Sequence, residues 1–164
     1  MDGRRTPVLD VIVDFGEVLG ALRAVENDIP FNRTLGIEMA RFDEDGLEVR
    51  VPMRPDLVGN FARGNLHGGV ISATLDLVGG LVAIHAAIAA GHLDSTEAVL
   101  ASFGGMGTID LRIDYLRPGF GEAFLGTGHA LRVGRKVTVT RMELHNDAGD
   151  LLAVGTGAYR LDAG

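Results

Sequence analysis

One stretch of the sequence limits the possible folds more than any other. Residues 70–90 are apolar except at Ser72, Thr74, Asp76 and His85. Together with its flanks this stretch predicts one long helix over about residues 68–93, and a helix that is apolar nearly all round must be buried on most sides. The rest of the chain therefore has to supply elements that cover it.

The same stretch approaches the length of a membrane span. An Asp near the middle of a lone span is unfavourable by roughly 3 kcal/mol on insertion scales. The neighbouring segments are amphipathic, as in a soluble protein. We therefore expect a buried core helix and no membrane span.

After the helix the pattern changes to the two-residue period of β-strands. Apolar and charged residues alternate from Thr108 to Tyr115, which predicts a strand. Three more strands are expected over residues 122–133, 136–145 and 152–161, separated by short turns rich in Gly, Asn and Asp.

The part before the helix combines a helix and a hairpin. Residues 8–26 have apolar side chains near helical spacing, which predicts an amphipathic N-terminal helix. Residues 31–39 then connect to a first strand, and a turn at residues 43–46 leads into a clear strand at 47–53. Residues 94–107 are expected to form a loop or a short helical excursion.

These elements predict the α+β class, with a curved antiparallel sheet wrapped around one long central helix and an extra N-terminal helix. We expect a single domain over residues 1–164, in which residues 1–28 form a helical extension. A sheet of this kind leaves open edges, which favours dimerisation.

Composition narrows the function. The net charge of −7 disfavours binding to nucleic acid. The sequence has no Cys, which excludes disulfides, thiolate chemistry and sulfur-ligated zinc or iron–sulfur sites and fits a reducing compartment. No apolar run typical of an export signal follows the first residues, so we expect a cytoplasmic protein. His85 and His92 share a helical face, but no third ligand is evident and no metal site is expected.

The residues that could take part in a reaction lie at the start of the long helix. Gly68 and Gly69 allow a ligand to approach backbone amides at the positive end of the helix dipole, where an oxyanion is stabilised. Asp76 lies two turns further on, nearly on the same face and about 10 Å along the axis. The residues alone allow two interpretations: a reactive site, or a tight entry turn with Asp76 hydrogen-bonded to a neighbouring strand.

The string 66–69, Leu-His-Gly-Gly, with Asp76 nine residues after the His, resembles the active-site segment of the hotdog-fold acyl-CoA thioesterases of the PaaI-like superfamily. Within that group it is most similar to the YigI-type branch. Further stretches share the likeness: residues 30–36, 58–60, 106–119 and 143–146. The resemblance covers about residues 29–159 and implies a hotdog fold.

The resemblance also implies a reaction, the hydrolysis of medium- or long-chain acyl-CoA to free acid and coenzyme A without a cofactor. Gly68, helped by Gly69, would bind the thioester oxygen. Asp76 would act as general base or as the attacking carboxylate. His67 would orient the loop or contact the thioester, and Thr108 would position water.

Two further sets of contacts follow from the likeness. Many relatives carry an Asn six residues before the His; that position is Phe61 here, so the displaced Asn60 is the candidate. The coenzyme A phosphates would be held by basic residues, for which the candidates are Arg132, Arg135, Lys136 and Arg117. The helix amides of one subunit and the Asp of its partner would share a site, so a homodimer or a dimer of dimers is implied.

Two other functions remain open. A hydratase or dehydratase on the same fold would depend on a catalytic His with an acid partner. A non-catalytic acyl-CoA-binding regulatory protein would have no use for a carboxylate beside the thioester. Asp76 and Thr108 favour the thioesterase.

Overall fold

The structure, a computed structural model, describes residues 13–26 and 28–161. Its elements follow one another as α1 (Phe15–Glu26), α2 (Pro30–Leu35), β1 (Glu38–Asp43), β2 (Gly46–Pro52), η1 (Pro55–Leu57), β3 (Val58–Asn60), β4 (Asn65–Leu66), α3 (Gly68–Ala89), α4 (Thr96–Gly105), β5 (Gly107–Tyr115), β6 (Ala123–Arg132), β7 (Val137–Asn146) and β8 (Leu151–Arg160). The predicted N-terminal helix is present as α1, and its expected first part, residues 8–12, lies outside the described residues.

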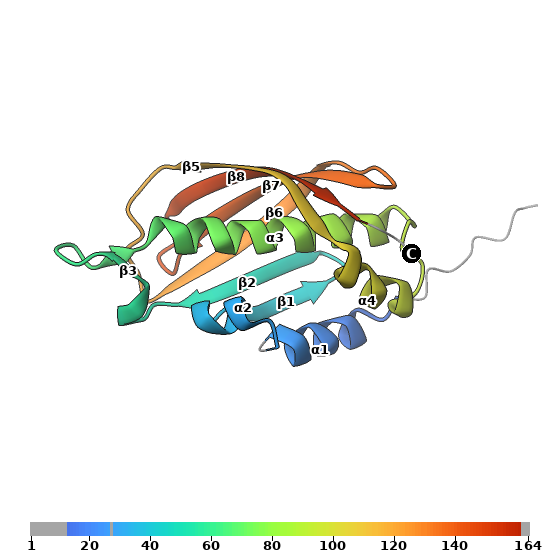
Figure 1. Cartoon of the computed structure of the whole chain (residues 1–164), viewed down its shortest axis with the longest axis horizontal. Coiled ribbons are helices and arrows are strands. Elements are labelled where there is room, and N and C mark those ends of the chain that lie inside the picture. The colour runs from blue at the N-terminus through green and yellow to red at the C-terminus, as the bar shows by residue number, and fades with distance from the viewer. Residues whose placement is uncertain (1–12, 27, 162–164) are drawn as a thin grey trace, which may run out of the picture.

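The predicted curved sheet around a central helix is confirmed (Figure 1). Six strands are joined in the order β1-β2-β6-β7-β8-β5, and every neighbouring pair is antiparallel. β5 therefore lies at one edge of the sheet. In the register of β5 with β8, Thr108 stands opposite Tyr159, residues that are far apart in the sequence.

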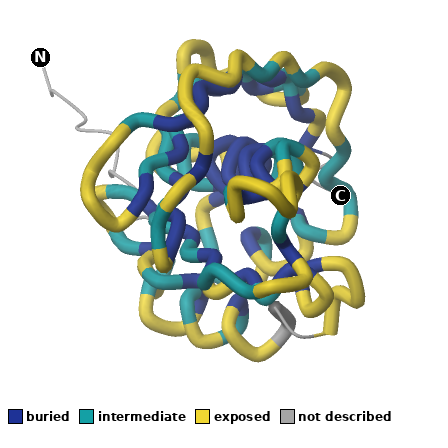
Figure 2. Tube along the Cα trace, turned by 90° about the vertical axis from the view of Figure 1, so that its left-hand side faces the viewer, coloured by how far each residue is buried: buried dark blue, intermediate teal, exposed yellow. Residues whose placement is uncertain are grey.

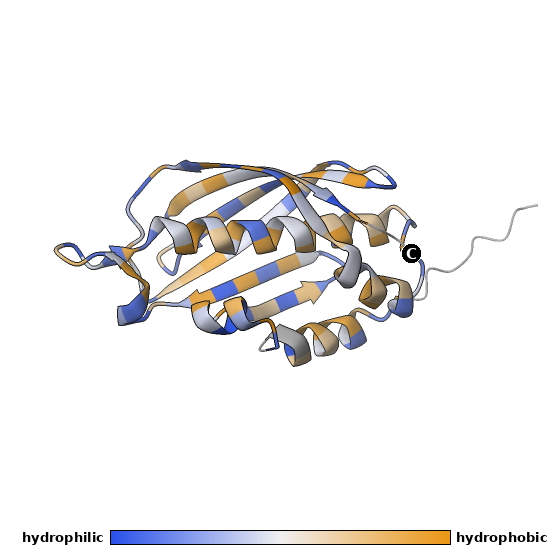
Figure 3. Ribbon diagram, viewed as in Figure 1, coloured by the Kyte–Doolittle hydropathy of each residue, from blue (hydrophilic) through white to orange (hydrophobic). Residues whose placement is uncertain are grey.

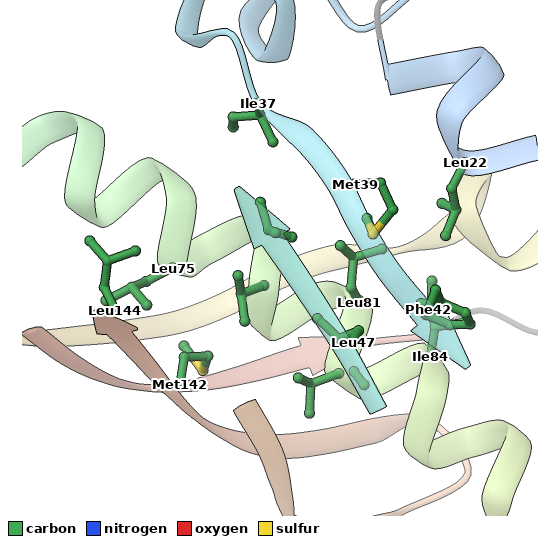
Figure 4. Close-up of a cluster of buried hydrophobic side chains, with 14 of the residues drawn as sticks. Leu22, Ile37, Met39, Phe42, Leu47, Leu75, Leu81, Ile84, Met142 and Leu144 are labelled. Atoms are coloured by element: carbon green, nitrogen blue, oxygen red, sulfur yellow. The ribbon is translucent and has the colours of Figure 1, made fainter. Parts of the chain in front are cut away.

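The core lies between α3 and the concave face of the sheet. Seen nearly end-on in Figure 2, α3 is the dark-blue coil at the centre of the molecule. Its Leu75, Leu81 and Ile84 are at most 2% exposed, and they belong to the same buried cluster as Met142 and Leu144 of β7, which are fully buried (Figure 4). Burial of this apolar surface stabilises the arrangement.

α3 is long and apolar enough to pass for a membrane span by composition, and Figure 3 shows apolar residues recurring along its ribbon, interrupted by pale and hydrophilic ones. However, 67% of its most apolar window is buried inside the protein. This burial shows that α3 is a core helix.

α1 packs against β1 and α4 and adds the fully buried Val18 to the core.

Two short helices were not clearly predicted. The connection expected over residues 31–39 contains α2, which has Pro30 in its first turn and ends at Gly36 with φ 67°, a left-handed conformation that glycine adopts easily. The expected loop or short excursion after α3 is the ten-residue helix α4, whose N-terminus is capped by Ser95 accepting from the Ala98 amide.

Candidate active site

The N-terminus of α3 presents one unengaged amide. His67 is the N-cap, and its Nδ1 accepts a hydrogen bond of 2.8 Å from the amide of Gly69. The Val70 amide bonds to the His67 carbonyl. Within residues 13–26 and 28–161 the Gly68 amide has no acceptor. The sequence suggested a contribution from Gly69 as well, but here its amide is occupied, so Gly68 is the donor left for a ligand.

Gly68 opens into a cavity of about 380 Å³. Asn60 lines the same cavity, so the displaced Asn does lie beside the helix start, although its side chain accepts from the Ala62 amide within its own loop. Phe61, which occupies the position of the relatives' Asn, is 98% exposed. Tyr115 also lines the cavity and donates to the Gly68 carbonyl at 3.2 Å, a contact that the sequence did not suggest.

The carboxylate of Asp76 lies on the next part of α3 and is half-buried. Its Oδ1 accepts from the Thr108 hydroxyl at 2.9 Å and from the Tyr159 hydroxyl at 3.3 Å. No partner for Oδ2 occurs in the described part of the chain. Sheet register explains the convergence, because Thr108 and Tyr159 are directly opposed on β5 and β8.

Tyr159 was missed by the sequence analysis. Burial, the negative charge of Asp76 and the hydrogen bond to it all raise the pKa of the Tyr159 phenol well above its ordinary value. The phenol therefore keeps its proton and acts as a hydrogen-bond donor throughout the neutral range. A hint was present in Gly155 and Gly157, which clear space on the same face of the strand.

Asp76 faces a cavity of about 310 Å³ that adjoins an apolar slot. The slot measures about 100 Å³ and shares four lining residues with the Asp76 cavity: Ile29, Asn32, Leu77 and Met106. Its other walls are apolar and come from α1, β1, α3, α4 and the residue before β1: Leu22, Ile37, Met39, Leu81 and Phe103. Figure 4 shows Leu22, Ile37, Met39 and Leu81 among these buried side chains.

The predicted coenzyme A contacts fall into two groups. Arg117 lines the Gly68 cavity and pairs with Asp150 at 3.6 Å. Arg132, Arg135 and Lys136 are exposed at the turn between β6 and β7, at the opposite end of the sheet (Figure 1). Among the residues that the structure describes, no group of three or more His, Cys, Asp or Glu could hold a metal ion.

Gly68 and Asp76 do not meet within one chain. They line different cavities, and a separation of eight residues in a helix corresponds to about 12 Å along its axis. One protomer thus holds a free amide at one place and a hydroxyl-anchored carboxylate at another.

Comparison with known proteins identifies the family of this chain. Residues 63–153, which include the helix start, Asp76 and Thr108, match the profile described as "Thioesterase superfamily". The chain belongs to the thioesterase superfamily. A protein of Escherichia coli strain K12 named "Medium/long-chain acyl-CoA thioesterase YigI" is 43% identical to this thioesterase over 131 residues, which are 80% of this chain and 84% of that one.

Solved structures agree with the assignment. A protein of Shewanella oneidensis, described as related to the thioesterase superfamily, is 42% identical and superposes with a TM-score of 0.82 over 96% of this chain and 99% of its own. A Bacillus halodurans protein solved with CoA has a TM-score of 0.62 over 90% of this chain and 91% of its own. Because only 21% of its residues are identical to those of this chain, it supports the fold and no statement about the ligand. The predicted hotdog fold and the prediction of a thioester hydrolase are confirmed.

Proposed function

We propose that this thioesterase hydrolyses medium- or long-chain acyl-CoA to a free acid and coenzyme A. The observation that carries the proposal is a carboxylate, Asp76, at the wall of a cavity that adjoins an apolar slot. A substrate with an acyl chain next to a reactive carbonyl needs these two environments side by side. The name of the Escherichia coli relative supports the same substrate class.

The reaction follows from the two polar groups. Asp76 takes a proton from water as the water oxygen attacks the thioester carbon, and a C–O bond forms. The carbonyl oxygen becomes negative and accepts from the Gly68 amide. When the intermediate collapses, the C–S bond breaks and the thiolate of coenzyme A takes up the proton. If Asp76 attacks the carbon itself, water hydrolyses the resulting anhydride and the products are the same.

We also propose that the enzyme is a homodimer. The base and the oxyanion donor must both lie within about 3–3.5 Å of the reacting atoms, whereas Gly68 and Asp76 of one chain are about 12 Å apart along α3. Gly68 of one protomer and Asp76 of its partner would complete one site. The free edge of β5, which carries Thr108 and the 58% exposed Ile109, is a suitable surface for pairing.

The remaining contacts belong to the same proposal. Arg117 and the cluster of Arg132, Arg135 and Lys136 would hold the coenzyme A phosphates, one group from each protomer. No cofactor takes part, because a carboxylate and an oxyanion donor suffice for the hydrolysis of a thioester. We place the enzyme in the cytoplasm, in keeping with a chain that lacks Cys.

The first experiment separates hydrolysis from binding. Thiol release from acyl-CoAs of two to sixteen carbons is measured for the wild type and for Asp76→Asn, which keeps the size of the side chain. We expect kcat to fall by at least about 100-fold with KM little changed. An equally active variant refutes the role of Asp76. A wild type that binds acyl-CoA without releasing thiol favours the regulatory binder.

The second experiment tests the shared site. Gly68→Pro removes the amide hydrogen at a position where proline fits, because Gly68 is the first helical residue and His67 is extended. We expect this variant and Asp76→Asn to be inactive alone. Co-refolded in equal amounts, they should recover about a quarter of the wild-type rate, since half the dimers carry one intact site of two. No recovery refutes the shared site.

A further inference from the structure

Tyr159 has an unusual environment for a core tyrosine. It is 1% exposed at the end of β8, and its hydroxyl lies 3.3 Å from Oδ1 of Asp76. Thr108 donates to the same oxygen from the neighbouring strand. Two hydroxyls thus share one carboxylate oxygen, while Oδ2 has no partner in the described ranges.

Glycines make room for the Tyr159 ring on two sides. A Cβ at Gly79 of α3 would overlap the hydroxyl of Tyr159, and a Cβ at Gly157 of β8 would lie 2.8 Å from Cε2 and 2.9 Å from the hydroxyl. Real Cβ atoms do not approach other atoms so closely. Glycine inside a helix or a strand is unfavourable by about 1 kcal/mol relative to alanine. Glycine at these two positions therefore weakens α3 and β8 locally but leaves room for the ring of Tyr159.

We propose that Tyr159 is a positioning residue for the carboxylate of Asp76: with Thr108 it holds Oδ1, so that Oδ2 is the oxygen presented to the thioester or to the attacking water. The inference rests on the proposed hydrolysis and extends it by naming the residue that orients the base. A carboxylate that rotates freely would have to be oriented again in each catalytic cycle, whereas a carboxylate held by two hydrogen-bond donors is already oriented for the reaction.

The surroundings of Asp76 make Tyr159 the relevant donor. Of the residues that line the Asp76 cavity, only Asp76 and Tyr159 have titratable side chains. The others are apolar or neutral: Ile29, Phe31, Asn32, Ala73, Leu77, Met106, Gly107 and Thr108. Because Thr108 is exposed and Tyr159 is buried, water competes more with the first hydrogen bond than with the second, which is partly buried.

The test compares the two tyrosines of the chain. Tyr159→Phe removes the donor and keeps the ring, and Tyr115→Phe removes the other phenol, which donates to the Gly68 carbonyl and not to Asp76. For both variants and the wild type, kcat and KM are measured, and the mobility of the Asp76 carboxyl is followed by ¹³C NMR relaxation without substrate.

We expect kcat of Tyr159→Phe to fall about 10- to 100-fold with KM changed less than about twofold. The Asp76 carboxyl should be more mobile in Tyr159→Phe than in the wild type, because it keeps only one of its two hydroxyl donors. Tyr115→Phe should leave the mobility of the Asp76 carboxyl unchanged. An Asp76 carboxyl that is as ordered in Tyr159→Phe as in the wild type overturns the inference. A wild type inactive on every acyl-CoA overturns the proposed function instead, while the mobility of the Asp76 carboxyl still decides the role of Tyr159.

Discussion

Alanine in place of Gly79 should destabilise this protein, although the same change usually stabilises a helix. In a helix interior the change from glycine to alanine gains about 1 kcal/mol. Here the new Cβ would overlap the hydroxyl and Cζ of Tyr159 and lie 2.6 Å from its Cε2. Overpacking of this kind is unfavourable by about 1–3 kcal/mol, and displacing the phenol weakens a hydrogen bond to a charged group worth about 1.5–3 kcal/mol.

The net loss is therefore about 1.5–5 kcal/mol, which lowers Tm by roughly 3–20 °C in a chain of this size. Gly20→Ala is the matched control, because Gly20 lies inside α1 with no atom within 4 Å of its Cβ position. It should raise Tm by about 2–4 °C.

Both variants are melted at one protein concentration, since the proposed dimer would make Tm depend on concentration. Gly79→Ala should also lose activity, whereas Gly20→Ala should not. If Gly79→Ala melts as high as Gly20→Ala, the ring does not need the space and the reasoning is wrong.

Two further predictions concern the slot and the phenol. Leu77→Trp narrows the passage between the Asp76 cavity and the slot; kcat/KM for long acyl-CoAs should fall at least about 10-fold while that for butyryl-CoA changes little, and equal losses for all chain lengths would exclude the slot as the acyl site. The pKa of Tyr159 in the folded protein is raised above its ordinary value of 10.0. Above pH 10 the unfolded chain therefore releases this proton while the folded protein still holds it, and the free energy of unfolding falls as the pH rises. Below pH 10 the contribution of Tyr159 to stability is complete. Urea unfolding above pH 10 should therefore show a flatter decline for Tyr159→Phe than for the wild type.

The central part of the fold could be predicted because its signals are local. The apolar stretch around Asp76 identifies the helix, and the alternation after Thr108 identifies the strands. α2 also had local signals in Pro30 and Gly36, but its six residues are too few for a helical period to emerge. The spacing of Gly68 and Asp76 along one helix likewise followed from the sequence.

The polar contacts of the site could not be predicted in the same way. Thr108 and Tyr159 come together through the pairing of β5 with β8, and register is set by long-range packing that no local pattern encodes. The engagement of the Gly69 amide by His67 depends on the rotamer of one side chain. The hydroxyl contacts to Asp76 and the His67 contact to the Gly69 amide determine which polar groups are open to a ligand, but the fold does not depend on them.

The cap formed by His67 limits which reactions this scaffold can perform. Nδ1 is the acceptor for the Gly69 amide, so in the neutral imidazole the hydrogen is carried by Nε2. Such a ring can donate to a bound molecule, but it has no nitrogen lone pair left with which to remove a proton unless the cap is broken. A dehydratase that relies on histidine as its base would need the opposite tautomer. In the proposed mechanism proton abstraction is left to the carboxylate of Asp76, and the hydrogen bond that begins the helix keeps His67 from acting as the base of a dehydratase.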